Sequence, residues 1–106
     1  MDKEEALNNL AKYESLPHLK HIMGNIFEMK KLAEGGNQTA LCIVMDLEKA
    51  IYHPTILTEK QQKVVIMKYL GKETNDYIAE QMNISETAIR KHLQGALKRI
   101  QRFLVN

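Results

Sequence analysis

The chain has 106 residues, of which 44% are apolar and 26% are charged. That length supports one compact domain or a small domain with a helical extension, and that apolar share argues against a disordered chain. Its single cysteine excludes an internal disulfide, and no apolar run is long enough to cross a bilayer. We therefore expect a protein of a reducing cytoplasm, with no membrane as a partner.

Charge is unevenly distributed along the chain. Residues 1–56 contain 6 Lys or Arg and 8 Asp or Glu, whereas residues 57–106 contain 9 and 5. The modest net charge of +2 therefore conceals a basic C-terminal half. This asymmetry indicates a polyanionic partner for the second half and a different role for the first.

The spacing of apolar residues predicts helices throughout, so we expect an all-α fold. In the first half, helices are predicted over residues 2–16, with Asp2 as the N-cap, and over residues 18–34. Pro17 marks the boundary, ending the first helix or opening the second. Gly24 is the weak point of the second helix, since glycine inside a helix costs about 1 kcal/mol relative to alanine.

The clearest break in the chain is the run Gly35, Gly36, Asn37, where we predict a flexible loop. Thr39 is then predicted to cap a third helix over residues 40–53. The apolar arc of this helix is wide, which predicts contacts on two sides. Its expected core-facing residues are Leu41, Val44, Met45, Ala50 and Ile51, with Ile43 and Leu47 widening the arc.

Three further helices are predicted in the second half, over residues 58–70, 75–82 and 86–104. Only residues 83–85 separate the last two. A turn that short favours two helices that cross steeply, which is the geometry of a helix-turn-helix. Asn83 stands where many such turns have glycine, and asparagine tolerates left-handed backbone better than most residues.

Local signals mark the ends of these helices. Thr58 with Gln61 fits a capping box, and Thr74 and Ser85 can each accept the free N–H groups of the following turn. Gly71 follows the first of the three helices where a C-terminal glycine stop is expected.

The last helix has two contrasting faces. At 100° per residue, its apolar residues fall within a stripe about 80° wide. The stripe consists of Ile89, Leu93, Leu97, Ile100 and Leu104, and the opposite side carries Thr87, Lys91, Gln94, Lys98, Gln101 and Arg102. Cationic and amide side chains can pair with guanine and adenine edges, so this side predicts a surface for the major groove of DNA.

These residues resemble a known family. The runs LTEKQQKVVIMKYL, DYIAEQMNISETAIRKHL and ALKRIQRFL are similar to the region 4 helix-turn-helix of sigma-70-type factors. LuxR-type response regulators and small phage late-gene regulators of the ArpU type share the same core. The resemblance implies a DNA-binding transcriptional regulator of phage or mobile-element origin, with double-stranded DNA as partner and RNA polymerase as a second candidate.

Nine residues are candidates for DNA binding. The N-terminus of helix 75–82 can offer backbone N–H groups to a phosphate. The first turns of helix 86–104 would read base edges, and its later cations would meet phosphate. The candidates are Thr74, Asn75, Glu86, Thr87, Arg90, Lys91, Gln94, Lys98 and Arg102.

Residues 1–55 form the first predicted unit and residues 56–106 the DNA-binding unit. Two roles remain open for the first: it completes the core, or it offers a surface for a homodimer, for RNA polymerase or for another regulator. Two alternative functions remain open as well. The protein could dock on polymerase or another factor without reading DNA, or it could be a phage DNA-packaging subunit.

Other chemistry has weaker support. His18, His21, Cys42 and His53 are zinc-ligand types, but they lack the usual ligand spacing. No phosphate-cradling glycine loop, nucleophile elbow or paired acid site is present. We therefore expect no metal, no cofactor and no enzymatic activity.

Overall fold

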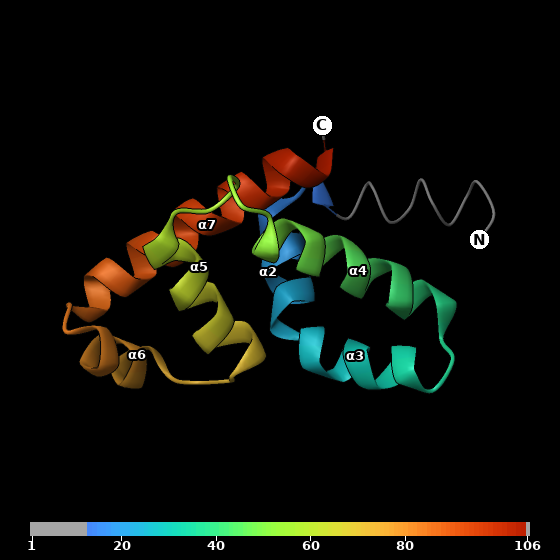
Figure 1. The fold of residues 1–106 in the computed structure, drawn as a ribbon, viewed down its shortest axis with the longest axis horizontal. Coiled ribbons are helices and arrows are strands. Elements are labelled where there is room, and N and C mark those ends of the chain that lie inside the picture. The colour runs from blue at the N-terminus through green and yellow to red at the C-terminus, as the bar shows by residue number, and fades with distance from the viewer. Residues whose placement is uncertain (1–12, 106) are drawn as a thin grey trace.

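The computed structural model describes residues 13–105 of the chain. Within them lie six α-helices and one π-helical turn, with no strand, which confirms the expected all-α fold (Figure 1). The predicted helix over residues 2–16 and its cap Asp2 lie outside the described residues, except at the end. At this end, Glu14 and Ser15 form a turn, and α2 starts at Leu16.

The predicted helix over residues 18–34 is wrong, because the structure has two helices, α2 (Leu16–Gly24) and α3 (Ile26–Glu34), which break at Asn25. The Asn25 amide Nδ2 donates to the carbonyl of His21 at 2.8 Å, and its backbone N–H donates to that of Ile22 at 3.0 Å. The Asn25 side chain thus hydrogen-bonds to a backbone carbonyl at the end of α2, in competition with the backbone N–H groups that would continue the helix. Pro17 opens α2 in its first turn.

Helix α4 (Gln38–Tyr52) runs antiparallel to α3, and the two are joined at Gly36, whose φ is +100° (Figure 1). Its cap is Asn37, whose Oδ1 accepts from the N–H of Ala40 at 2.9 Å. The prediction of Thr39 as the cap is therefore wrong. Both residues are good N-caps, and the structure uses the one next to the glycine turn.

The buried face of α4 also differs from the predicted face. Leu41 and Met45 are 39% and 60% exposed, so they do not face the core. The reason is that the six buried positions fall within an arc of about 120° at 100° per residue, and Leu41 and Met45 lie about 60° and 100° outside its edge. The buried residues are Ala40, Ile43, Val44, Leu47, Ala50 and Ile51.

Helix α5 (Glu59–Val65) has the predicted capping box: the Thr58 hydroxyl accepts from the N–H of Gln61 at 3.1 Å, and the Gln61 side chain accepts from that of Thr58 at 3.0 Å. Its last turn widens into the π-helical turn η1 (Ile66–Leu70). The helix ends at Gly71 as predicted, but for another reason. Gly71 has a φ of −86°, and the left-handed residue is Lys72.

Space explains the glycine at position 71. A Cβ atom there would lie 2.9 Å from the backbone oxygen of Met67, closer than real Cβ contacts allow. The chain then continues into α6 (Asn75–Met82) and α7 (Glu86–Val105).

Helix α7 is the axis on which both halves are assembled. Figure 1 shows α5 and α6 against its N-terminal part, and α2 and α4 against its C-terminal part, in agreement with the contacts between these helices. The Gln101 amide Nε2 donates to the carbonyls of Tyr13 and Glu14 at 3.0 and 2.7 Å. Gln101 is therefore half-buried against the segment before α2, and its predicted place on the free polar side is wrong.

Two glycine substitutions should change stability in opposite directions. We expect Gly71→Ala to lower the free energy of unfolding by about 1–3 kcal/mol, because its methyl group meets the Met67 carbonyl. Gly24→Ala should raise it by up to about 1 kcal/mol, since nothing lies within 4 Å of the new methyl group and alanine favours the helix. Urea unfolding followed by circular dichroism measures both, and equal shifts would contradict this packing.

Candidate nucleic-acid interface

The corner between α6 and α7 has the predicted capping and turn. The Thr74 hydroxyl accepts from the N–H of Tyr77 at 3.2 Å, and the Ser85 hydroxyl accepts from that of Ala88 at 3.1 Å. Asn83 takes the left-handed conformation, with φ 55° and ψ 45°. Asn83 and the Ser85 cap turn the chain sharply between the helices, so that α6 lies across the end of α7 instead of extending it (Figure 1).

Apolar contacts hold this corner closed. Ile78 and Ile89 are fully buried, and Ala79 is nearly so. The N–H of Ile84 donates to the carbonyl of Ala79 at 3.1 Å, which fixes the turn to the end of α6. A side chain larger than alanine at position 79 would separate α6 from α7.

The polar side of α7 is open to solvent. Six of the predicted contact residues on α7 are exposed. Among residues 13–105 the only one of these six in an ion pair is Arg90, whose Nη2 lies 3.9 Å from Oε1 of Glu86. The other cations of the set are therefore available to an external anion. The exposed residues are Thr87, Arg90, Lys91, Gln94, Lys98 and Arg102.

Two carboxyl groups meet at the start of α7. The neighbouring Asp76 carboxyl raises the pKa of Glu86, first through a shared hydrogen bond and then through charge repulsion, and Arg90 opposes this shift only weakly. A shared proton at this place would reduce the negative charge presented beside the cations of α7.

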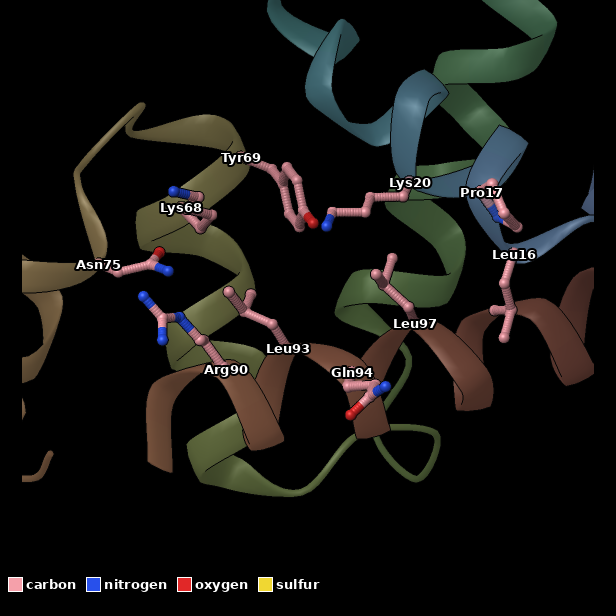
Figure 2. Close-up of a pocket in the computed structure, with 10 residues that line it drawn as sticks. All are labelled: Leu16, Pro17, Lys20, Lys68, Tyr69, Asn75, Arg90, Leu93, Gln94 and Leu97. Carbon is pink, nitrogen blue, oxygen red and sulfur yellow. The ribbon is translucent and has the colours of Figure 1, made fainter. Parts of the chain in front are cut away.

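A groove lies beside this surface, between α2, η1, the start of α6 and α7. We call it the α2–α7 groove; its volume is about 750 Å³. Figure 2 shows its ten lining residues, which are Leu16, Pro17, Lys20, Lys68, Tyr69, Asn75, Arg90, Leu93, Gln94 and Leu97.

The groove brings together three of the nine candidates, Asn75, Arg90 and Gln94. Thr74, at the start of α6, and the other candidates, spread along α7, do not line it. It also adds Lys20 and Lys68, which sequence reasoning missed. No local signal could identify them, because the groove exists only once α2 has packed on α7.

His53, one of the four residues of zinc-ligand type, contacts a backbone N–H and an aromatic ring. Nδ1 of His53 accepts from the N–H of Thr55 at 3.2 Å, and the His53 ring lies 5.3 Å from that of Phe103. Within residues 13–105, no three His, Cys, Asp or Glu side chains are grouped so as to hold a metal ion. No helix in this part of the chain has the length and apolar character needed to cross a membrane.

Comparison with known families identifies the second half. Residues 56–100, about two fifths of the chain, match the family model described as Sigma-70, region 4. The match covers α5, η1, α6 and most of α7. The chain has no match among curated proteins and none among solved structures.

The Asp76–Glu86 pair predicts a pH effect on DNA binding. Because the pKa of Glu86 is raised, its carboxyl takes up a proton at a higher pH than an isolated glutamate, and DNA affinity should rise as pH falls into that range. In Asp76→Asn the repulsion is removed, so the pKa of Glu86 returns towards its ordinary value and the rise moves to lower pH. Fluorescence anisotropy measures DNA affinity over a pH series for the wild type and for the variant. Any pH dependence that comes from histidines is common to both proteins, so the difference between the two profiles reports on the Asp76–Glu86 pair. Identical pH profiles would contradict the coupling.

Proposed function

We propose that this protein, whose residues 56–100 form a sigma-70 region 4 helix-turn-helix, is a sequence-specific transcriptional regulator that inserts α7 into the major groove of double-stranded DNA. A region 4 helix-turn-helix supports DNA binding and transcription regulation in general. The specific reading role of α7, and a phage or mobile-element origin, are the further parts of the proposal. The origin rests only on the resemblance to ArpU-type regulators.

The observation that carries the proposal is the separation of the two faces of α7. Ile89 and Ile100 are fully buried, while Lys91 and Lys98 on the opposite side are exposed and make no ion pair within residues 13–105. A helix that is fixed by one face and presents free cations on the other can enter a groove without rearrangement. Thr87, Lys91 and Gln94 lie where the first turns of α7 would meet base edges.

Mutation of the reading face tests this role. Replacing Lys91 with alanine should cost about 1–3 kcal/mol of binding to a specific site selected from a random DNA pool, and Arg90→Ala should do the same. Lys49→Ala is the matched control, because Lys49 is an exposed lysine on α4, away from the corner. Anisotropy titration on the selected site and on a scrambled site measures affinity and specificity together. Equal binding by all three variants would refute the assignment.

A second candidate, docking on RNA polymerase or another factor without reading DNA, is favoured by an apolar surface on α4. Leu41, Met45 and Tyr52 follow one side of this helix and are 39%, 60% and 54% exposed. Exposed apolar side chains in a row fit a protein partner or a second copy of the chain. Titration with DNA at two salt concentrations separates the functions: steep salt dependence supports groove binding, whereas retention of polymerase without DNA supports docking.

A further inference from the structure

We propose that the α2–α7 groove binds the sugar–phosphate backbone of the DNA, with Lys20 and Lys68 as its principal contacts, each to one phosphate. The inference rests on the proposed function, since it places this backbone beside the bases that α7 would read. It gives the N-terminal helices a direct part in DNA binding. Lys20 also lies outside the segment that matches the family model.

The charge of the groove is the first argument. Three cations line it, and each comes from a different element: Lys20 from α2, Lys68 from η1 and Arg90 from α7. Of the described residues that line the groove, none is an Asp or a Glu. A groove lined by three cations and by no carboxylate has a positive potential and attracts an anion.

The absence of ion pairs is the second argument. Lys30 pairs with Glu48 at 2.9 Å and Lys72 with Glu28 at 2.6 Å, so carboxylates do neutralise other lysines of this fold. Within residues 13–105, Lys20 and Lys68 have no such carboxylate partner. Figure 2 shows the Lys20 side chain extending from α2 towards Tyr69, across the groove.

The shape of the groove favours a chain of sugar and phosphate over an isolated ion. Its volume of about 750 Å³ exceeds what one phosphate needs. Leu16, Pro17, Leu93 and Leu97 provide an apolar lining on which a deoxyribose can rest. Polar groups that bind phosphate beside an apolar surface that accepts sugar are what a nucleic-acid backbone requires.

The position of the groove identifies the anion as DNA. Arg90 and Gln94 line the groove and also belong to the exposed side of α7, so the groove continues into the reading surface. Asn75 contributes the start of α6, and the first N–H groups of a helix lack acceptors within the helix and favour an anion. A duplex held in its major groove by α7 would bring one strand past these residues.

Packing fixes the backbone of Lys20 in this position. Leu19 and Met23, on either side of it in α2, are fully buried, and the Gln101 amide holds the segment just before α2. Lys20 therefore needs no large motion to meet the phosphate, which reduces the entropic cost of the contact.

The test is the salt dependence of DNA affinity. For Lys20→Gln and Lys68→Gln, the slope of log K against log salt should become shallower by about 0.9 each, the value for one lost phosphate contact on duplex DNA. Affinity should fall about 3- to 10-fold at low salt, equally for specific and scrambled sites. Lys49→Gln makes the same charge change elsewhere on the surface and should keep the wild-type slope, and Lys20→Arg should keep it too.

The outcomes separate this inference from the proposed function. If wild type binds the selected site and Lys91→Ala weakens it, but Lys20→Gln and Lys68→Gln match the Lys49→Gln control, the groove assignment is overturned and the DNA-binding role stands. If wild type binds no DNA, both fail. Calorimetry with inorganic pyrophosphate tests whether the groove binds a free phosphate compound instead of DNA. If pyrophosphate binding depends on Lys20 while the salt dependence of DNA affinity is unchanged in Lys20→Gln, the assignment is also overturned.

Discussion

Burial of one apolar stripe on α7 is the constraint on which the rest of the structure depends. This helix of 20 residues packs on α5 and α6 near its start and on α2 and α4 near its end. Ile89, Ala96 and Ile100 are fully buried along it. Each large apolar side chain buried in this way contributes about 1.5–3 kcal/mol. Since four helices use the same stripe, the direction of the opposite, cationic side is fixed by all of them together.

A consequence is that the N-terminal helices are coupled to the proposed DNA-binding face of α7. Leu19 and Met23 of α2 and Leu47 of α4 belong to the same apolar cluster as Leu93 and Leu97 of α7. A division into residues 1–55 and 56–106 remains a proposal about how the chain is organised. The continuous cluster means that a change in α2 or α4 would be transmitted to α7, and that α2 holds its side chains at set positions relative to α7.

The parts of the fold that could be predicted from sequence are those determined by local chemistry. Thr58, Thr74 and Ser85 cap their helices because a hydroxyl can reach an N–H three residues later without any other contact. Asn83 adopts left-handed backbone for a similarly local reason. The errors at Asn25 and Thr39 arose where two local conformations have similar energies. At Asn25 a continuous helix competes with a broken one, and at Thr39 one polar N-cap competes with the neighbouring polar residue Asn37. There tertiary packing decides.

Residues at the edge of a helix stripe were the hardest to predict from sequence. Gln101 lies 40° from the direction of Leu97 on α7, whereas Lys98 lies 100° away, at 100° per residue. The nearer side chain reaches the carbonyls of Tyr13 and Glu14, and the farther one stays in solvent. Periodicity places both on the polar side, because it cannot show how far a neighbouring helix extends around the stripe. Packing of α2 therefore narrows the free face of α7 on one side, and in the same step it supplies Lys20 to the groove that it creates.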